Sequence, residues 1–442
     1  MADHAVSDHP AVQAALDRLA TLSPGRDILG LGRITTILAR LGDPHLTLPP
    51  VFHVAGTNGK GSTCAFLRAA LEADGRKVHV YSSPHLCRFN ERIRVAGALI
   101  DDDELAARLT RVMDVAEDVS ASFFEVTTAA AFLAFAEHRA DACIIEVGLG
   151  GRLDATNVIA APAVGGIAQL GIDHQAFLGD RLTDIAAEKA GIAKAGTTMV
   201  TMRYLPEIAS VVGRRIDEAG ACWLPRGESW DIIAYRGRLH YRDAAGRLDL
   251  PLPRLPGAHQ FANLGLATAM LRHQRALEVS EAALRAAPLW AQWPARLQGL
   301  DAGPVKDILP AYWRVTLDGG HNPDAGLAIS AWLAETLGAD ERADLVIGML
   351  ANKDVEGFLA PIRPHVRSIR SLPVLGHDHH GPEAFAAIAQ EWGVPHGAHS
   401  DVIDAMRDLA ATRLGEPVGA ALLCGSLYLA GQVLKLNGQE PG

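Results

Sequence analysis

The sequence predicts an α/β protein in which a mostly parallel sheet carries helices on both faces and a smaller α/β domain follows. Three observations support this fold class. Apolar runs rich in β-branched residues alternate with helical patterns, which favours parallel strands joined by helices. Polar and glycine-rich motifs come directly after these runs, where such sheets bind ligands. A segment that contains Pro294 separates the first series of strands and helices from a second one.

The first series is expected to contain five strands joined by helices. The strands are expected at residues 51–55, 78–82, 143–147, 164–170 and 198–202. The helices between them are expected at residues 62–74, 124–139 and 182–193. Between residues 230 and 252 the pattern alternates around Gly and Asp, which predicts hairpins. A helix with Asn263 near its start then runs to about residue 277.

The second series follows a linker that we expect at residues 289–296. Its strands are expected at residues 313–317, 344–347, 368–375 and 420–424. A chain of 442 residues exceeds what one hydrophobic core usually holds, so two domains are expected, 1–293 and 294–442. Hydrophobic residues make up 49% of the chain and charged residues 21%, which is enough apolar material for a large core.

Charge and targeting signals limit the classes of partner and compartment. The formal net charge of −10, from 41 basic and 51 acidic residues, argues against nucleic acid or an anionic membrane as partners. We find no signal peptide, and no apolar run reaches the roughly 18–20 residues of a membrane span. Five scattered cysteines without a CxxC pair are typical of reduced thiols, so a cytoplasmic protein is expected. They are Cys64, Cys87, Cys143, Cys222 and Cys424.

The most informative motif is GTNGKGS at residues 56–62, between an expected strand and an expected helix. Its glycines let the backbone close around phosphate oxygens, and the helix N-terminus points N–H groups at them. Lys60 adds a mobile cation, and Ser62 offers a hydroxyl to Mg²⁺. Gly61 separates these two residues, and Val54 or Ala55 stands where the standard motif has its first glycine. The motif predicts a nucleoside triphosphate site; the alternative is a plain glycine-rich turn.

Other candidates depend on how the chain folds. Glu146 ends an apolar strand, where a carboxylate needs a cation such as Mg²⁺ or, alternatively, Arg152. The glycine-rich residues 148–157 form a plausible substrate loop. His174 and Lys189 are, by spacing alone, ordinary structural residues.

Two motifs of the second series have equally open interpretations. Asp318 follows a strand and could accept ribose hydroxyls, or it could form an Asx-type turn with the Asn-Pro that follows. Three histidines crowd residues 377–380, too close together to converge easily on one ion, and Gly381-Pro382 follows them. We interpret this segment as a solvated loop rather than a metal site.

Together and in this order, these motifs resemble the folylpolyglutamate synthase/dihydrofolate synthase family of Mur-type ligases. The matching segments are GTNGKGS (56–62), YSSPHL (81–86), FNERIRV (89–95), FFEVTTAAAF (123–132), EVGLGGRLDATN (146–157), EKAGI (188–192), HQFANLGLA (259–267), LDGGHNP (317–323), GMLANKD (348–354) and CGSLYLAG (424–431). The resemblance covers about residues 27–431. It implies an N-terminal P-loop Mur-ligase-type ATPase domain with a parallel sheet and a smaller C-terminal Rossmann-like domain that ligates glutamate.

The resemblance implies an ATP-dependent ligase that adds L-glutamate to dihydropteroate and to the γ-carboxylate of (tetrahydro)folate. ATP would turn a carboxylate, a poor electrophile, into an acyl phosphate that the glutamate amine attacks. The protein would supply positioning and charge neutralisation. The implied partners are small molecules only, and the implied enzyme is a monomer. Three alternatives stay open: a monofunctional folylpolyglutamate synthase, a Mur-type ligase of cell-wall synthesis, and a nucleotide-binding regulatory module without enzymatic activity.

The resemblance also implies roles for individual residues. Those implied at ATP are Thr57, Asn58, Gly59, Lys60, Gly61, Ser62, Asn263, Arg296, Asp318 and His321. Those implied at Mg²⁺, with two ions expected, are Ser83, Glu146, His174 and Lys189. Lys189 would be carbamylated, and the catalytic residues would be Lys60, His174 and Lys189. Those implied at the pterin are Leu29, Gly30, Ser122, Phe123, Phe124, Leu153, Asp154 and Ala155, within a wider match that begins at Asp27.

The chain departs from the family pattern in three places. His174 is followed by Gln175-Ala176 instead of Thr-Asp, a change in the residues that would hold the His174 side chain in place. Ala295 replaces a glycine between Pro294 and Arg296, where domain closure would complete the site. Gly32 replaces a glutamate before Arg33, which bears on dihydropteroate binding.

Overall fold

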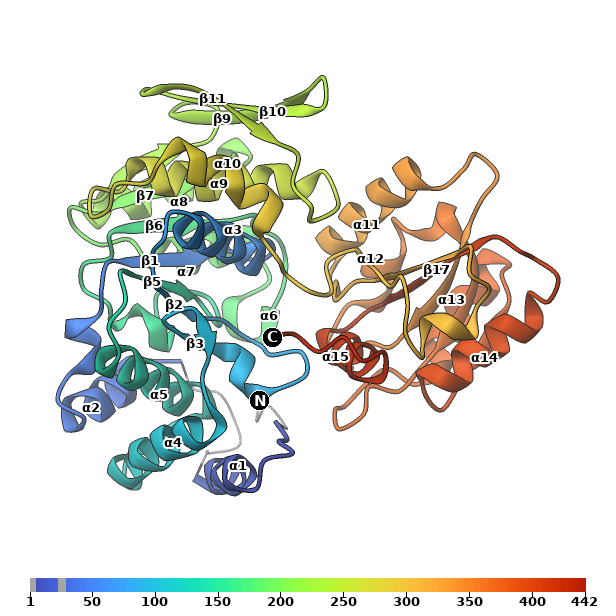
Figure 1. Ribbon diagram of the computed structural model, residues 1–442, viewed down its shortest axis with the longest axis horizontal. Helices are drawn as coiled ribbons and strands as arrows, with labels where there is room; N and C mark the ends of the chain where they lie inside the picture. The colour runs from blue at the N-terminus through green and yellow to red at the C-terminus, as the bar shows by residue number, and fades with distance from the viewer. Residues whose placement is uncertain (1–4, 23–28) are drawn as a thin grey trace. The chain divides into compact units, whose positions relative to one another are not determined.

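The computed structural model describes residues 5–22 and 29–442 (Figure 1). The chain divides into two compact units, each with its own sheet and core. Unit 1 comprises Met1–Arg254 and Gln260–Gln292, and unit 2 comprises Leu255–His259 and Trp293–Gly442. In the described part of the chain, no helix is both long and apolar enough to cross a membrane.

Unit 1 is built on an eight-stranded sheet in the order β4-β3-β2-β5-β1-β6-β7-β8. The six strands from β2 to β8 in this order run parallel, whereas β3 and β4 form an antiparallel extension. The strands are β1 Val51–Ala55, β2 Val78–Tyr81, β3 Ile93–Val95, β4 Ala98–Leu99, β5 Ala142–Glu146, β6 Val164–Ile167, β7 Thr198–Thr201 and β8 Cys222–Pro225. Every residue of β1 and β5 is buried, as expected for central strands covered on both faces.

Helices cover both faces of this sheet. They are α1 Pro10–Leu22, α2 Gly32–Arg40, α3 Lys60–Ala73, α4 Asp102–Ala116, α5 Phe123–Glu137, α6 Gln175–Leu178, α7 Leu182–Ala190, α8 Pro206–Glu218, α9 His259–His273 and α10 Glu281–Trp290. Short 3₁₀ turns include η1 Pro44–Thr47, η2 Phe89–Arg92 and η3 Ala155–Val158. In Figure 1, α3, α9 and α10 lie on one side of the sheet, and α2, α4 and α5 lie on the other.

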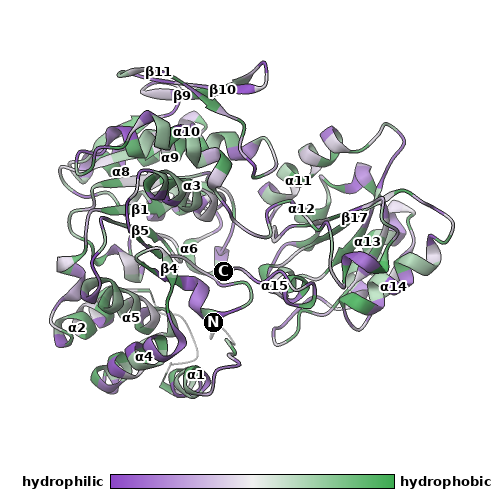
Figure 2. Cartoon of the chain, viewed as in Figure 1, coloured by the Kyte–Doolittle hydropathy of each residue, from purple (hydrophilic) through white to green (hydrophobic). Residues whose placement is uncertain are grey.

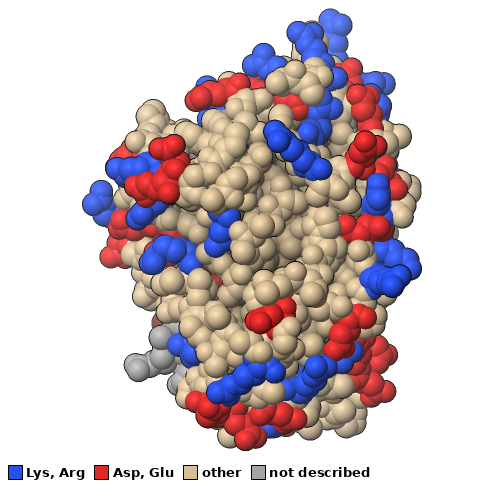
Figure 3. Space-filling model, turned by 90° about the vertical axis from the view of Figure 1, so that its left-hand side faces the viewer, with Lys and Arg blue, Asp and Glu red and all other residues tan. Residues whose placement is uncertain are grey.

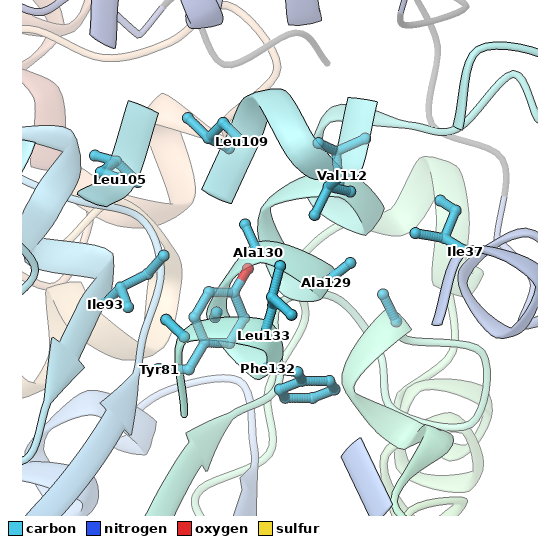
Figure 4. Close-up of a cluster of buried hydrophobic side chains, with 14 of the residues drawn as sticks. Ile37, Tyr81, Ile93, Leu105, Leu109, Val112, Ala129, Ala130, Phe132 and Leu133 are labelled. Carbon is cyan, nitrogen blue, oxygen red and sulfur yellow. The ribbon is translucent and has the colours of Figure 1, made fainter. Parts of the chain in front are cut away.

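One hydrophobic core of unit 1 lies between the sheet and helices α1, α2, α4 and α5 (Figure 4). On α4 the buried residues Leu105, Leu109 and Val112 recur every three or four positions, so one side of the helix faces the core. Figure 2 shows the corresponding division of α4 into an apolar and a polar side. On α5 nearly every residue is buried, because this helix lies between the sheet and the outer helices.

A separate three-stranded antiparallel sheet, in the order β11-β10-β9, confirms the predicted hairpins. Its strands are β9 Trp230–Tyr235, β10 Arg238–Asp243 and β11 Gly246–Pro251. Asp243 anchors it to α9, since its buried carboxylate accepts hydrogen bonds from Arg272 Nε and Nη2 at 2.7 and 3.0 Å. Basic side chains gather over this sheet at the top of Figure 3; its exposed arginines are Arg236, Arg238, Arg242 and Arg247.

Unit 2 contains a six-stranded sheet in the order β12-β13-β17-β14-β15-β16, in which only β12 runs antiparallel to its neighbour. The strands are β12 Gln298–Gly299, β13 Trp313–Leu317, β14 Ala343–Ile347, β15 Val366–Ser371, β16 His396–Ala398 and β17 Gly419–Cys424. The helices are α11 Pro323–Thr336, α12 Val355–Leu359, α13 Pro382–Trp392, α14 Val402–Thr412 and α15 Leu427–Leu436. Short 3₁₀ turns η4 Lys306–Ile308 and η5 Arg363–His365 complete the unit.

The structure confirms the α/β class and corrects several details. All predicted strands are present, but those expected to reach residues 170 and 375 end at Ile167 and Ser371. The short strands β3, β4, β8, β12 and β16 were not predicted, because they lack a long apolar run. The expected linker begins too early, since Leu289 and Trp290 form the last turn of α10.

A buried charge network ties the strands of unit 2 to α14. The Asp344 carboxylate, in β14, accepts hydrogen bonds from Ser368 Oγ at 2.5 Å and Arg413 Nη2 at 2.7 Å. Arg370, in β15, lies with Nη1 3.7 Å from the same carboxylate and donates from Nε to Asp408 at 2.8 Å. A buried charge is stable only when it is paired and hydrogen-bonded, and each of these groups depends on the others.

We therefore expect Asp344→Ala to destabilise unit 2 by about 3–5 kcal/mol, because it leaves two arginines without their shared carboxylate. Urea titration with amide hydrogen exchange in β14 and β15 measures this loss. The control Asp340→Ala removes an exposed carboxylate of the same unit and should change stability by less than about 0.5 kcal/mol. Equal effects of the two substitutions would contradict the assigned role of the network.

Candidate active site

The predicted phosphate loop connects β1 to α3 and requires glycine at two positions. Gly59 precedes the helix with φ +86°, and a Cβ there would lie 2.4 Å from Asn263 Oδ1. At Gly56 a Cβ would lie 2.8 Å from the Cβ of Ala168. Lys60 is the first residue of α3, so the positive end of the helix dipole and the N–H groups of the first turn face this loop. The loop can therefore hold phosphate oxygens.

The segment after β6 fastens the phosphate loop. The backbone N–H groups of Thr57 and Asn58 donate to the carbonyl of Gln169 at 2.8 and 3.2 Å. The Thr57 hydroxyl donates to the carbonyl of Gly171 at 3.0 Å. These contacts hold the loop in its curved form, and Gln169 is a supporting residue that sequence reasoning did not identify. Its only signal was its place near the end of the strand expected at residues 164–170.

Lys60 and Lys189 point at the same atom of this loop. Lys60 Nζ lies 3.1 Å from the carbonyl oxygen of Gly56, and Lys189 Nζ lies 2.9 Å from it. Burial and the nearby Lys60 charge lower the pKa of Lys189 to about 7, against the weaker opposing effect of Asp173 and Asp154. A large share of the Lys189 amine is therefore uncharged near neutral pH. The structure thus brings together two lysines that lie far apart in the sequence.

The strand order places three further predicted residues at neighbouring strand ends. In the order β2-β5-β1-β6, strands β5 and β6 flank β1, and β2 lies on the far side of β5. Ser83 follows β2, Glu146 ends β5, and the segment that leads to His174 follows β6. Glu146 is 4% exposed, and its strand register places it opposite Val54. Parallel strands end at the same edge of the sheet, so these groups share that edge with the phosphate loop.

The charges of this edge act on the first turns of α3. Burial and the Glu146 carboxylate raise the pKa of the Cys64 thiol, whereas Lys60 lowers it. Glu146 and Lys60 therefore both lie within electrostatic reach of Cys64. Among the described residues no three His, Cys, Asp or Glu side chains form a group that could hold a metal. This absence concerns those four residue types only, whereas the predicted metal ligands also include the serine Ser83 and the lysine Lys189.

His174 lies at the start of α6 in a left-handed backbone conformation, with φ 55°. Its side chain is 42% exposed, and its Nε2 lies 4.0 Å from Asp173 Oδ1. Gln175, one of the departures from the family pattern, donates from Nε2 to Asp180 at 3.1 Å.

The second glycine-rich loop is closed around Asp154. Its buried carboxylate accepts hydrogen bonds from the Leu149 N–H at 2.8 Å and the Thr156 N–H at 3.0 Å. A Cβ at Gly148 would lie 2.3 Å from the Phe124 ring, so two predicted pterin-binding segments lie in contact. Arg152 pairs with Glu188 at 2.7 Å. The alternative in which Arg152 neutralises Glu146 is therefore wrong, because Arg152 is turned toward α7.

The start of α5 holds the remaining predicted pterin residues. Ser122 caps the helix, and Glu125 accepts hydrogen bonds from the Ser122 N–H at 2.7 Å and from Arg33 Nε at 2.9 Å. Leu29 and Gly30 lie just before α2, whereas Asp27 lies outside the described residues. A Cβ at Gly32 would meet nothing within 4 Å, so the glycine there is not required by packing.

Unit 2 gathers its own predicted residues around Asp318. The Asp318 carboxylate accepts hydrogen bonds from the Leu297 N–H at 2.8 Å and the Gly320 N–H at 2.7 Å. Burial lowers the pKa of His259, with Asp318 raising it and Arg296 lowering it, so Asp318 and Arg296 both lie within electrostatic reach of His259. Sequence reasoning did not assign His259 to a site.

Three other features of unit 2 bear on residues named in the sequence analysis. Ala295 has φ 55°, a left-handed conformation that favours the glycine it replaces. His321 Nδ1 lies 2.9 Å from the carbonyl oxygen of Gly319. In the histidine-rich segment, His379 is exposed, and His380 Nε2 lies 2.8 Å from the carbonyl oxygen of Lys353.

The chain is similar to known proteins along most of its length. It is 35% identical over 419 residues to the dihydrofolate synthase/folylpolyglutamate synthase of Escherichia coli (strain K12), covering 92% of this chain and 91% of that protein. It is 31% identical over 420 residues to the folylpolyglutamate synthase of Lacticaseibacillus casei, with 91% and 92% covered. The chain belongs to the dihydrofolate synthase/folylpolyglutamate synthase family. No protein-family model matches it.

Solved structures of this family agree with the assignment. E. coli FolC in complex with DHPP and ADP superposes with a TM-score of 0.85 at 33% identity, covering 97% of this chain and 98% of that one. A bifunctional folylpolyglutamate synthase/dihydrofolate synthase with Mn, AMPPNP and L-glutamate bound gives a TM-score of 0.83 at 32% identity, covering 96% and 97%. As a member of this synthase family, the chain is an ATP-dependent acid–amino-acid ligase.

Proposed function

We propose that this synthase ligates L-glutamate to dihydropteroate and then to the γ-carboxylate of (tetrahydro)folate. The observation that carries the proposal is the convergence of Lys60 and Lys189 on the Gly56 carbonyl, at a sheet edge shared with Glu146. A regulatory nucleotide-binding module does not need a buried lysine of lowered pKa beside its phosphate loop.

In the proposed reaction, Lys60 leaves the loop carbonyls and neutralises charge on the phosphates of ATP. Thr57, Asn58, Gly59, Gly61 and Ser62 complete the loop around them. The acceptor carboxylate takes the γ-phosphoryl group and becomes an acyl phosphate. The glutamate amine then attacks the acyl carbon, and phosphate leaves. The loops hold the reactants close together and in line, which supplies much of the rate enhancement.

The donors at the sheet edge suit Mg²⁺, which prefers oxygen ligands and usually takes one or two carboxylates. Glu146 supplies a carboxylate that is 4% exposed, and Ser83 supplies a hydroxyl. We propose that these residues, with His174 and Lys189, hold two Mg²⁺ ions, which offset phosphate charge when bound.

We also propose that Lys189 is carbamylated. The uncharged amine adds to carbon dioxide and releases one proton, which leaves a carbamate anion. The lowered pKa of Lys189, about 7, keeps part of the amine in the reactive form at neutral pH. A carbamate provides oxygen donors where an ammonium group would repel a metal ion.

The remaining assignments concern the acceptor and unit 2. We propose that Asn263, Arg296, Asp318 and His321 bind ATP. We propose that the pterin lies against Leu29, Gly30, Ser122, Phe123, Phe124, Leu153, Asp154 and Ala155. In this scheme residues 1–293 form the ATP-binding domain, residues 294–442 form the glutamate-ligase domain, and the enzyme works as a monomer, which light scattering can test.

The decisive experiment compares acceptors. We expect ATP- and glutamate-dependent phosphate release with both dihydropteroate and tetrahydrofolate. Release with tetrahydrofolate alone would identify a monofunctional folylpolyglutamate synthase. Release with neither pterin, but with a cell-wall precursor and an amino acid, would overturn the proposal.

A further inference from the structure

A buried chain of hydrogen bonds joins the ATP-loop strand to the proposed acceptor loop. It begins at His53 in the middle of β1, continues through Thr156 in η3 and ends at Asp154. His53 Nε2 lies 2.9 Å from Thr156 Oγ1, and Thr156 Oγ1 lies 2.5 Å from Asp154 Oδ1. The exposed fractions of these residues are 0%, 0% and 2%, so bulk water does not compete with the contacts.

The direction of the hydrogen bonds from His53 to Asp154 follows from the hydrogens that each group can donate. The Thr156 hydroxyl has one hydrogen and donates it to the Asp154 carboxylate. His53 must then donate its Nε2–H to Thr156 Oγ1, which assigns the tautomer of the ring. Burial and the nearby Lys194 charge lower the pKa of His53 to about 3, so the ring is neutral at working pH. Donors aligned in this way polarise and strengthen one another.

Asp154 connects these hydrogen bonds to the loop of residues 149–156. Its carboxylate also accepts from the N–H groups of Leu149 and Thr156, so the turn from 149 to 156 closes around one side chain. Leu153 and Ala155, two proposed acceptor contacts, lie within this turn. Because β1 runs directly into Gly56, the same strand sets the positions of the phosphate loop and, through His53, of the acceptor loop.

We propose that His53 is a positioning residue for acceptor binding, acting through Thr156 and Asp154 on the loop that holds the pterin acid. This inference rests on the proposed function, because the loop binds an acceptor only under that assignment. His53 is fully buried and is not one of the proposed contacts of the acceptor or of ATP. Its loss should therefore weaken acceptor binding while ATP binding persists.

The test uses two substitutions that interrupt the chain of hydrogen bonds and two that preserve it. His53→Leu and Thr156→Val remove a donor while keeping similar volume. His53→Gln and Thr156→Ser retain one. We expect the first pair to raise KM for dihydropteroate about five- to twentyfold with KM for ATP within about twofold. The second pair should recover most of this loss. The double variant His53→Leu/Thr156→Val should be no worse than the poorer single variant, because both break one chain.

A control separates positioning from stability. Thr201, in β7, has a buried hydroxyl that accepts from Trp223 Nε1 at 3.0 Å. Thr201→Val should lower Tm without changing KM for dihydropteroate. If Thr156→Val also lowers Tm and leaves that KM unchanged, or if KM for ATP rises in parallel, the proposal is overturned. Should His53→Leu fail to fold, Thr156→Val alone decides.

Amide hydrogen exchange tests the loop independently of turnover. Residues 149–156 should exchange faster in His53→Leu and Thr156→Val than in the wild type or Thr201→Val. Unchanged exchange there would overturn the positioning role. If the wild-type enzyme shows no dihydropteroate-dependent phosphate release although the exchange result holds, the proposed function fails and the structural coupling stands.

Discussion

Replacing Lys60 by alanine should abolish ATP-dependent ligation while leaving the fold intact. We expect kcat/KM to fall by at least about a thousandfold, roughly 4 kcal/mol of transition-state stabilisation, because the variant lacks the mobile cation at the phosphate loop. The Lys60 side chain is only partly buried and donates to the loop carbonyls of Gly56 and Thr57. Its loss should therefore cost little stability. Phosphate release with dihydropteroate and glutamate measures the effect.

The control for this experiment is Lys77→Ala, which removes an exposed lysine just before β2. It should retain wild-type turnover. Circular dichroism and thermal unfolding should show that both variants are folded. Near-normal turnover by folded Lys60→Ala would refute the role assigned to the lysine and, with it, the phosphate-binding function of the loop.

Replacing Lys189 by alanine should lower kcat by about a hundredfold or more, and short carboxylic acids should restore part of the activity. Formate or acetate can occupy the vacated space and supply the anion that the proposed carbamate provides. The same acids should not restore Lys60→Ala, because that variant lacks a cation. Titration of each variant with formate and acetate under identical assay conditions checks both expectations.

Carbamylation also predicts a dependence on pH and on carbon dioxide. Because burial lowers the pKa of Lys189 to about 7, the reactive amine increases as pH rises from about 6 to 8. Labelling with ¹³C-bicarbonate should therefore yield a carbamate signal in the wild type that grows over this range and is missing from Lys189→Ala. Full activity of Lys189→Ala without added acid would show that the carbamate is dispensable.

Local sequence was enough to predict the strand-loop-helix unit from which the phosphate chemistry is proposed. The run of buried residues from Val51 to Ala55, the glycines after it and the helical pattern from Lys60 onward are neighbours in the chain, so their geometry follows from short-range rules. Ser62 places its hydroxyl one residue later than the standard motif does, a spacing that the resemblance to the family implies is typical of its phosphate loop.

Long-range partners could not be predicted in the same way. Arg152 was a plausible partner for Glu146 in sequence, yet it pairs with Glu188 on α7. His53 looked like one residue of an apolar strand, and its link to Thr156 spans 103 residues. The network around Asp344 likewise depends on strands and a helix that are separate in the sequence. Periodicity reports which face of an element is buried, but not which element covers it.

The sequence by itself determined the α/β class, the strand-loop-helix unit around residues 56–62 and the family, because these depend on local patterns and on motifs in a set order. Only the tertiary structure decided that the side chains of Lys60 and Lys189 both donate to the carbonyl of Gly56, although Lys189 lies 133 residues from Gly56 in the sequence. The physical reason is burial. The fold brings α7 against the loop and removes water from the Lys189 amine, and this desolvation lowers the pKa of the amine to about 7.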